Sequence, residues 1–169
     1  PQNNTMRMKQ PQLGIALLMI FGATLSFLGC EISRGSTEKN NLAAMRTLAI
    51  SITGKATYTA WLADSSETEQ LGLMNVTEAE LPTDKGMIFI FPYDRQLNFW
   101  MRNTIIPLDI AYIRSDGTIV KIYTMQPLQE FGYNSIEPAR FALEVRAGQF
   151  AAKGIKEGDH VELPAELFK

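Results

Sequence analysis

Apolar and polar residues alternate over short stretches along most of the chain beyond residue 42, and this period of two is typical of half-buried β-strands. The strands predicted in this way are 48–52, 58–62, 87–91, 96–101, 109–114, 118–125, 140–146 and 160–163. Turn-forming residues separate them, and Gly54-Lys55 and Ser115-Asp116-Gly117 each favour a hairpin between the flanking strands. The pattern therefore predicts a series of short strands joined by tight turns.

Two of these segments lead to different expectations about burial. Residues 87–91 are a continuous apolar run between a glycine and a proline, which predicts a central strand buried on both faces. In 140–146 large apolar residues alternate with polar or small ones, so only one face of that strand is expected to be buried. Glu144 falls on the other face, and we expect it to point outward.

Helical signals are short. Ser66 and Glu69 have capping-box spacing, and Gly72 then interrupts the segment. Residues 149–155 favour one or two further helical turns. Because no alternation of strands with long helices is present, the chain is predicted to be mainly β: an antiparallel sandwich or barrel with one or two short helices, formed by a single domain over residues 42–169.

The N-terminal part has the pattern of a secretory leader. Arg7 and Lys9 precede an apolar run over residues 13–28 that contains no acidic residue. The run is shorter than the roughly 20 residues that span the hydrocarbon core of a bilayer, and it matches the apolar region of a signal peptide. Residues 1–29 are therefore predicted to be a signal peptide.

The chain's single cysteine, Cys30, directly follows Gly29 at the end of this leader. The arrangement resembles the lipobox of bacterial lipoproteins, in which the cysteine receives a diacylglycerol and becomes the first mature residue. Phe27 and Leu28 depart from the residues preferred there, and the alternative is an uncleaved membrane anchor. Residues 30–41 are polar and predict a flexible linker. Both alternatives place the rest of the chain outside the cytoplasm, in the periplasm or at the cell surface, held at a membrane.

Composition excludes several classes of site. The chain has 16 Lys and Arg against 18 Asp and Glu, without a basic cluster, so a nucleic-acid partner is not expected. One cysteine excludes an internal disulfide and a multi-thiolate metal site, and one histidine excludes a histidine-rich centre. We therefore predict no metal and no cofactor.

Five segments together resemble one family. They are Gly72–Met74, Gly86–Phe89, Phe99–Ile110, Ala142–Glu144 and Gly154–Asp159. In this order they are similar to domain-of-unknown-function family 192 of bacteria and archaea, over residues 56–163. The resemblance implies a jelly-roll-like β-sandwich in a protein that is frequently exported or lipid-anchored, and it implies no reaction.

The candidate ligand site lies around the turn after residue 99. Its residues are Trp100, Met101, Arg102, Asn103, Thr104 and Asp109. Large apolar side chains with a few polar groups are typical of the rim of a small-molecule pocket. The alternative is structural: Trp100 and Met101 would fill the core, Asn103 would shape the turn, and Asp109 would accept backbone N–H bonds.

Two functions are compatible with these patterns. The first is a membrane-anchored binding or accessory module of the bacterial cell envelope, with a small molecule, a saccharide, a lipid or a protein as ligand. The second is a metal-independent hydrolase or lyase that uses Asp109 and Glu144 as an acid–base pair. The binding module is favoured because it requires no catalytic residues. Carboxyl groups on opposite faces of the sheet would not support the second function.

Overall fold

The structure is a computed structural model that describes residues 37–168. The described residues all belong to one compact unit. The predicted signal peptide and Cys30 lie outside the described residues. Within residues 37–168, none of the helices combines the length and the apolar character that crossing a membrane requires.

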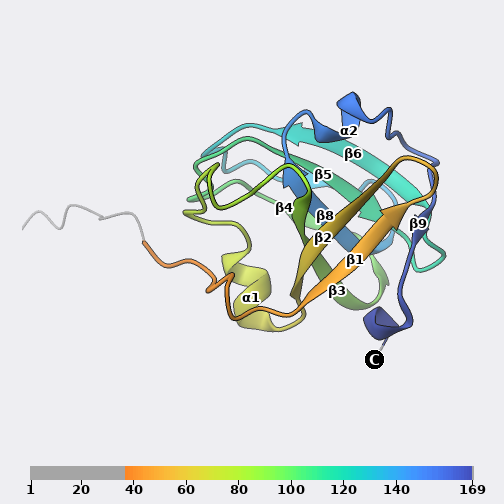
Figure 1. The fold of residues 1–169 in the computed structure, drawn as a ribbon, viewed down its shortest axis with the longest axis horizontal. Coiled ribbons are helices and arrows are strands. Elements are labelled where there is room, and N and C mark those ends of the chain that lie inside the picture. The colour runs from red at the N-terminus through yellow and green to blue at the C-terminus, as the bar shows by residue number, and fades with distance from the viewer. Residues whose placement is uncertain (1–36, 169) are drawn as a thin grey trace, which may run out of the picture. The chain divides into compact units, whose positions relative to one another are not determined.

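Nine strands and three short helices follow one another along the described chain (Figure 1). They are β1 (Thr47–Ile52), β2 (Ala56–Ala63), α1 (Ser66–Leu71), β3 (Lys85–Arg95), β4 (Asn98–Phe99), β5 (Leu108–Ile113), β6 (Ile119–Met125), β7 (Tyr133–Asn134), β8 (Ala139–Arg146), α2 (Gln149–Ala152), β9 (Val161–Glu162) and the 3₁₀ helix η1 (Ala165–Phe168). The predicted mainly β fold is confirmed.

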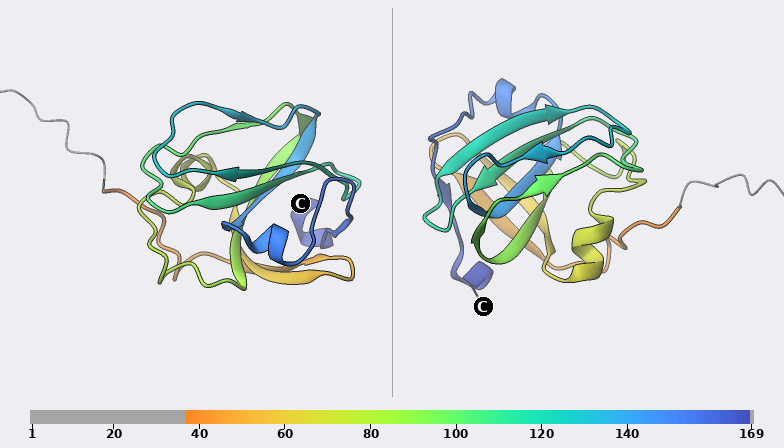
Figure 2. Two further views of the ribbon diagram at one scale, coloured as in Figure 1. Left: turned by 90° about the horizontal axis from the view of Figure 1, so that it is seen from above. Right: turned by 180° about the vertical axis from the view of Figure 1, so that it is seen from behind.

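Seven strands form one sheet in the order β6-β5-β8-β3-β2-β1-β9, and β4 pairs with β7 in a separate two-stranded ribbon. The large sheet curls into a half-barrel, as the views from above and from behind show (Figure 2). The central position of β3 confirms the prediction made from its continuous apolar run. Both predicted hairpins are also present, since β1 pairs with β2 and β5 pairs with β6.

One pair of neighbours is parallel. β2 runs alongside β3 with Trp61 opposite Met87, whereas the other paired strands are antiparallel. Parallel neighbours require a crossover connection, and residues 64–84 with α1 provide it. The sequence did not indicate a β-α-β unit here, because a helix of six residues is too short to show a helical period.

Both faces of the sheet are covered. The α1 face carries Met87, Phe89 and Tyr112, and it packs against Leu73 and neighbouring apolar residues of the crossover. The opposite face, here called the α2 face, packs against α2 and the C-terminal segment. The expectation that Glu144 points outward is therefore wrong: it lies on the α1 face and is only 4% exposed, because the crossover covers a face that alternation alone assigned to solvent.

Two other local expectations need correction. The cap of α1 is Ser65 with Thr68 in place of Ser66 with Glu69: the Thr68 N–H donates to Ser65 Oγ, and Ser65 N–H donates to Thr68 Oγ1. The strand predicted over 96–101 shrinks to β4, because its short partner β7 pairs with only two residues.

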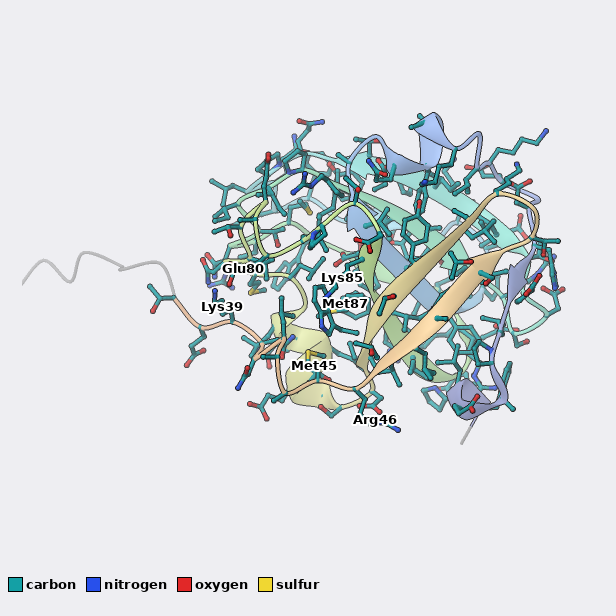
Figure 3. All side chains as sticks on the ribbon, viewed as in Figure 1. Lys39, Met45, Arg46, Glu80, Lys85 and Met87 are labelled. Carbon is teal, nitrogen blue, oxygen red and sulfur yellow. The ribbon has the colours of Figure 1, made fainter. Side chains whose placement is uncertain are left out.

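Described residues that precede the predicted domain boundary at residue 42 also contact the domain. Asn40 is buried, and its Nδ2 donates to the carbonyls of Thr68 and Gly72 at 3.0 and 2.9 Å. Lys39 forms an ion pair with Glu80 at 2.6 Å, and the two side chains lie beside each other in Figure 3. The last residues of the predicted linker are thus packed on the domain.

Candidate functional site

A pocket of about 390 Å³ opens between α1, the α1 face of the sheet and the turn that carries β4. We call it the α1 pocket. Glu69 and Gln70 line it from the helix, Phe89 lines it from β3, and Trp100 and Glu144 complete the wall. Its volume lies within the range of roughly 300–1,000 Å³ that is usual for small-molecule sites.

Glu144 is the most unusual group in this wall. On β8 it sits between Met87 of β3 and Ile110 of β5 in the sheet register. Among residues 37–168, no hydrogen bond or ion pair reaches its carboxyl group, which lines the pocket. Burial raises the pKa of Glu144 to about 8, so the group is mostly protonated at neutral pH.

The aromatic part of the wall is tightly packed. The Phe99 ring stands edge-on to Phe89 with ring centroids 4.8 Å apart, and it contacts Tyr112 in the same way at 5.7 Å. Trp100, by contrast, is 48% exposed, and the Arg102 guanidinium lies 5.6 Å from its ring centroid. The pocket therefore has a rigid aromatic floor and a more accessible indole at its rim.

The end of α1 lies unusually close to this floor. Gly72 ends the helix with φ of +46°, a left-handed conformation that favours glycine. A Cβ atom there would stand 3.3 Å from Phe89 Cζ, so even alanine would crowd the ring. Gly72 therefore allows the end of α1 to lie against Phe89 of the sheet.

Two further charged side chains line the pocket. Burial raises the pKa of Glu69, and the positive charge of Arg95 partly opposes this shift. Arg95 is exposed, and its guanidinium carbon lies 4.6 Å from the centroid of the Phe91 ring. The pocket thus combines aromatic surface with two carboxyl groups and one guanidinium.

Asp109 lies elsewhere. It is 1% exposed on β5 and faces the α2 side of the sheet, where its carboxylate accepts hydrogen bonds from Thr124 Oγ1 at 2.7 Å and from the Phe150 N–H at 3.0 Å. Its role is to connect β5 to β6 and to α2. Because Asp109 and Glu144 lie on opposite faces, they cannot act together on one substrate.

Some of the remaining predicted site residues line the α1 pocket and others do not. Thr104 is buried and lines the α1 pocket with Trp100. Met101 is completely buried in the core. Asn103 adopts φ of +55°, and its carbonyl accepts a hydrogen bond from the Asn75 N–H at 2.8 Å, so it shapes the turn. Arg102 is exposed above Trp100.

Sequence reasoning missed the contribution of α1 to the site. Glu69 carries only the signal of a capping residue in the sequence, and Arg95 carries none. The signal that could have identified Glu144 is its position as a lone acid beside apolar residues in β8, a strand next to the apolar run 87–91 of β3. Within residues 37–168, no cluster of three or more His, Cys, Asp or Glu side chains could hold a metal ion.

Fold and pocket together define a small β-rich domain with one helix-covered site, and comparison with known proteins identifies its family. The model of DUF192, described as "Uncharacterized ACR", matches residues 48–163. The chain belongs to this family, which confirms the resemblance seen in the sequence.

Two solved structures are similar to the chain. A protein of unknown function from Novosphingobium aromaticivorans has 32% identity and a TM-score of 0.68, over 75% of this chain and 91% of that one. A candidate transcription regulator from Sinorhizobium meliloti has 32% identity and a TM-score of 0.65, over 70% of this chain and 94% of that one. A comparison with curated proteins gave no match.

Proposed function

We propose that this protein is a binding module of the bacterial cell envelope that takes a small ligand in the α1 pocket. The observation that carries the proposal is the Glu144 carboxyl: it is buried, lacks a partner among the described residues, and lines an open pocket. A carboxyl group that lines a pocket and bonds to no protein group can bond to a ligand that enters the pocket, and such convergent polar groups orient small molecules.

The surroundings of Glu144 support a ligand of limited size. The floor is aromatic, and the rim carries amide and hydroxyl groups such as those of Gln70, Asn98 and Thr104. Apolar walls with a few polar groups fix the orientation of a small molecule. A shared acid–base mechanism with Asp109 has no geometric support, so we favour binding over hydrolysis.

A fragment screen followed by ¹⁵N–¹H NMR tests the pocket. We expect hits to shift the Trp100 indole and the backbone amides of Leu71–Met74, which line the pocket. Gln70→Trp should fill the pocket and abolish these shifts, whereas Glu67→Trp, on the same helix but outside this pocket, should preserve them. Hits that cluster elsewhere, or shifts that persist in Gln70→Trp, would contradict the proposal.

The envelope location rests on the leader and Cys30. An acylated cysteine with two or more chains would hold the domain stably at a membrane. Labelling cells with radioactive palmitate should mark the wild-type protein and leave Cys30→Ser unlabelled. Export without label would favour the uncleaved anchor, and full-length protein in the soluble cytosolic fraction would contradict the location.

A further inference from the structure

The charges of the α1 pocket are unbalanced. Its ionisable lining residues are Glu69, Arg95 and Glu144, two acids and one base. Arg95 counters Glu69, since its charge opposes the rise in the pKa of that carboxyl. Glu144 has no such counterpart. An ionised Glu144 therefore leaves the pocket one positive charge short of neutrality.

The aromatic floor also favours a positively charged ligand. The faces of aromatic rings attract cations, most strongly where water is excluded. Phe89, Phe91, Phe99 and Trp100 all line the pocket, and two of them already interact with guanidinium groups, Phe91 with Arg95 and Trp100 with Arg102. A positively charged group inside the pocket would contact aromatic rings of the lining and the Glu144 carboxylate.

We propose that the ligand of the α1 pocket is a small organic cation, an amine or amidine on an apolar body, whose charged group binds the Glu144 carboxylate. This inference rests on the proposed function. An anion would be repelled by Glu69, and by Glu144 wherever that group is ionised, and its one cationic partner in the pocket lining would be the exposed Arg95. A neutral ligand could instead accept a hydrogen bond from the protonated Glu144 carboxyl group. The test below distinguishes this alternative from binding of a cation.

Binding of a cation is coupled to a proton. The ionisable groups that face Glu144 or share its side of the sheet are Tyr112 on β5, Lys121 and Tyr123 on β6, Glu69 on α1, Lys85 and Arg95 on β3, and Arg146 on its own strand. Lys85 lies over Trp61, the Arg146 side chain donates to the Glu78 carbonyl, and Lys121 pairs with Glu157. Burial is the cause of the raised pKa of Glu144, and no nearby cation lowers it, so none of these groups balances Glu144. The cation must therefore displace the Glu144 proton, which leaves to solvent while an N–H···O⁻ contact forms.

Three probes of one shape test this with the full chain in a mild detergent: benzamidinium, which stays charged between pH 6 and 9, neutral benzamide and anionic benzoate. Isothermal titration in two buffers of different ionisation enthalpy should show benzamidinium binding with release of up to one proton. Its affinity should rise roughly fiftyfold from pH 6 to pH 8, in proportion to the ionised fraction of Glu144. Benzamide and benzoate should bind at least tenfold more weakly at pH 8.

Variants assign the effect to the pocket. Glu144→Gln mimics the protonated acid in size, so the fold should be kept, while benzamidinium affinity should fall at least tenfold and lose its pH dependence. Glu69→Gln should cost a few-fold only. Glu162→Gln, on the exposed side of β9, should bind like the wild type.

Three outcomes would overturn the inference. Equal binding of benzamide or benzoate would exclude a cation preference, and unchanged benzamidinium binding by Glu144→Gln would exclude the assigned carboxylate. In both cases the pocket remains a ligand site if the Trp100 indole still shifts. Absence of benzamidinium binding would also overturn the inference, and the fragment screen then decides separately on the proposed function.

Discussion

Asp109 and Glu144 are both buried carboxyl groups on paired strands, yet they face opposite sides of the sheet. Asp109 accepts bonds from a side chain of β6 and from the backbone of α2. Glu144 faces a pocket and has no partner among the described residues. A buried carboxyl group therefore joins elements of the fold on the α2 face, whereas a second buried carboxyl group lines a pocket on the α1 face.

The physical reason for the difference is the cost of burying charge. A buried carboxyl group without hydrogen-bond partners takes up a proton more readily than an exposed one, because burial disfavours its charged form. Burial raises the pKa of Glu144 to about 8 by this route. Asp109 makes two hydrogen bonds that join elements of the fold, whereas Glu144 makes none, and this contrast can be tested by substitution.

Asp109→Ala should have the largest effect. It removes two charge-assisted hydrogen bonds and leaves the Phe150 N–H without its acceptor, so the free energy of unfolding should fall by about 3–5 kcal/mol. Asp109→Asn, which can still accept from Phe150, should lose less than half of this. Urea unfolding followed by circular dichroism measures both, and a loss below about 1 kcal/mol for the alanine variant would contradict the structural role.

The second-largest effect should be the contribution of Glu144 to the pH dependence of the free energy of unfolding. Its folded pKa of about 8 lies above the value of 4.5 for the free side chain, so its stabilising contribution is complete below pH 4.5 and is lost as the pH rises to 8. Between pH 5 and 7 the wild type should therefore lose about 2–3 kcal/mol relative to Glu144→Gln. Parallel stability curves for the two proteins would show that Glu144 is not buried without a partner.

Gly72→Ala tests the close approach of α1 on the pocket side. The left-handed φ and the contact with Phe89 should make alanine destabilising by about 1–2 kcal/mol. The displaced helix end should also weaken ligand binding. Gly54→Ala is a matched control, because Gly54 also has a positive φ but a methyl group added there would have no atom within 4 Å. Equal losses in unfolding free energy and unchanged binding would refute the packing role of Gly72.

Thr124→Val should have the smallest effect. It removes one of the two bonds to Asp109 at an exposed position of β6, where valine suits a strand, so we expect a loss of about 1 kcal/mol. In the double variant with Asp109→Ala the two losses should not add, since both remove the same bond. Additive losses would show that Thr124 does not act through Asp109.

The fold could be predicted from local patterns, and the site only in part. The buried run of β3 and the glycines of the hairpins are local features, so β1–β2, β3 and β5–β6 were all predicted correctly. The burial of Glu144 depends on residues 64–84 covering the sheet, and this tertiary contact leaves no mark on the alternation within β8.

The candidate site shows the same limit. Trp100 and Thr104 were predicted from a run of large and polar residues, and they do line the pocket. Asp109 was grouped with them because it is close in sequence, but one residue along a strand changes the face to which a side chain points. The face on which an acidic side chain lies depends on the strand register, and the register cannot be assigned without knowing which strands pair.

The most direct measurement follows the side-chain carboxyl carbon of Glu144 by ¹³C NMR through a pH titration, with and without benzamidinium. Our account predicts a midpoint near pH 8 for the free protein, and an ionised carboxylate already at pH 7 when the cation is bound. A midpoint near the ordinary glutamate value, or a titration that benzamidinium leaves unchanged, would contradict it.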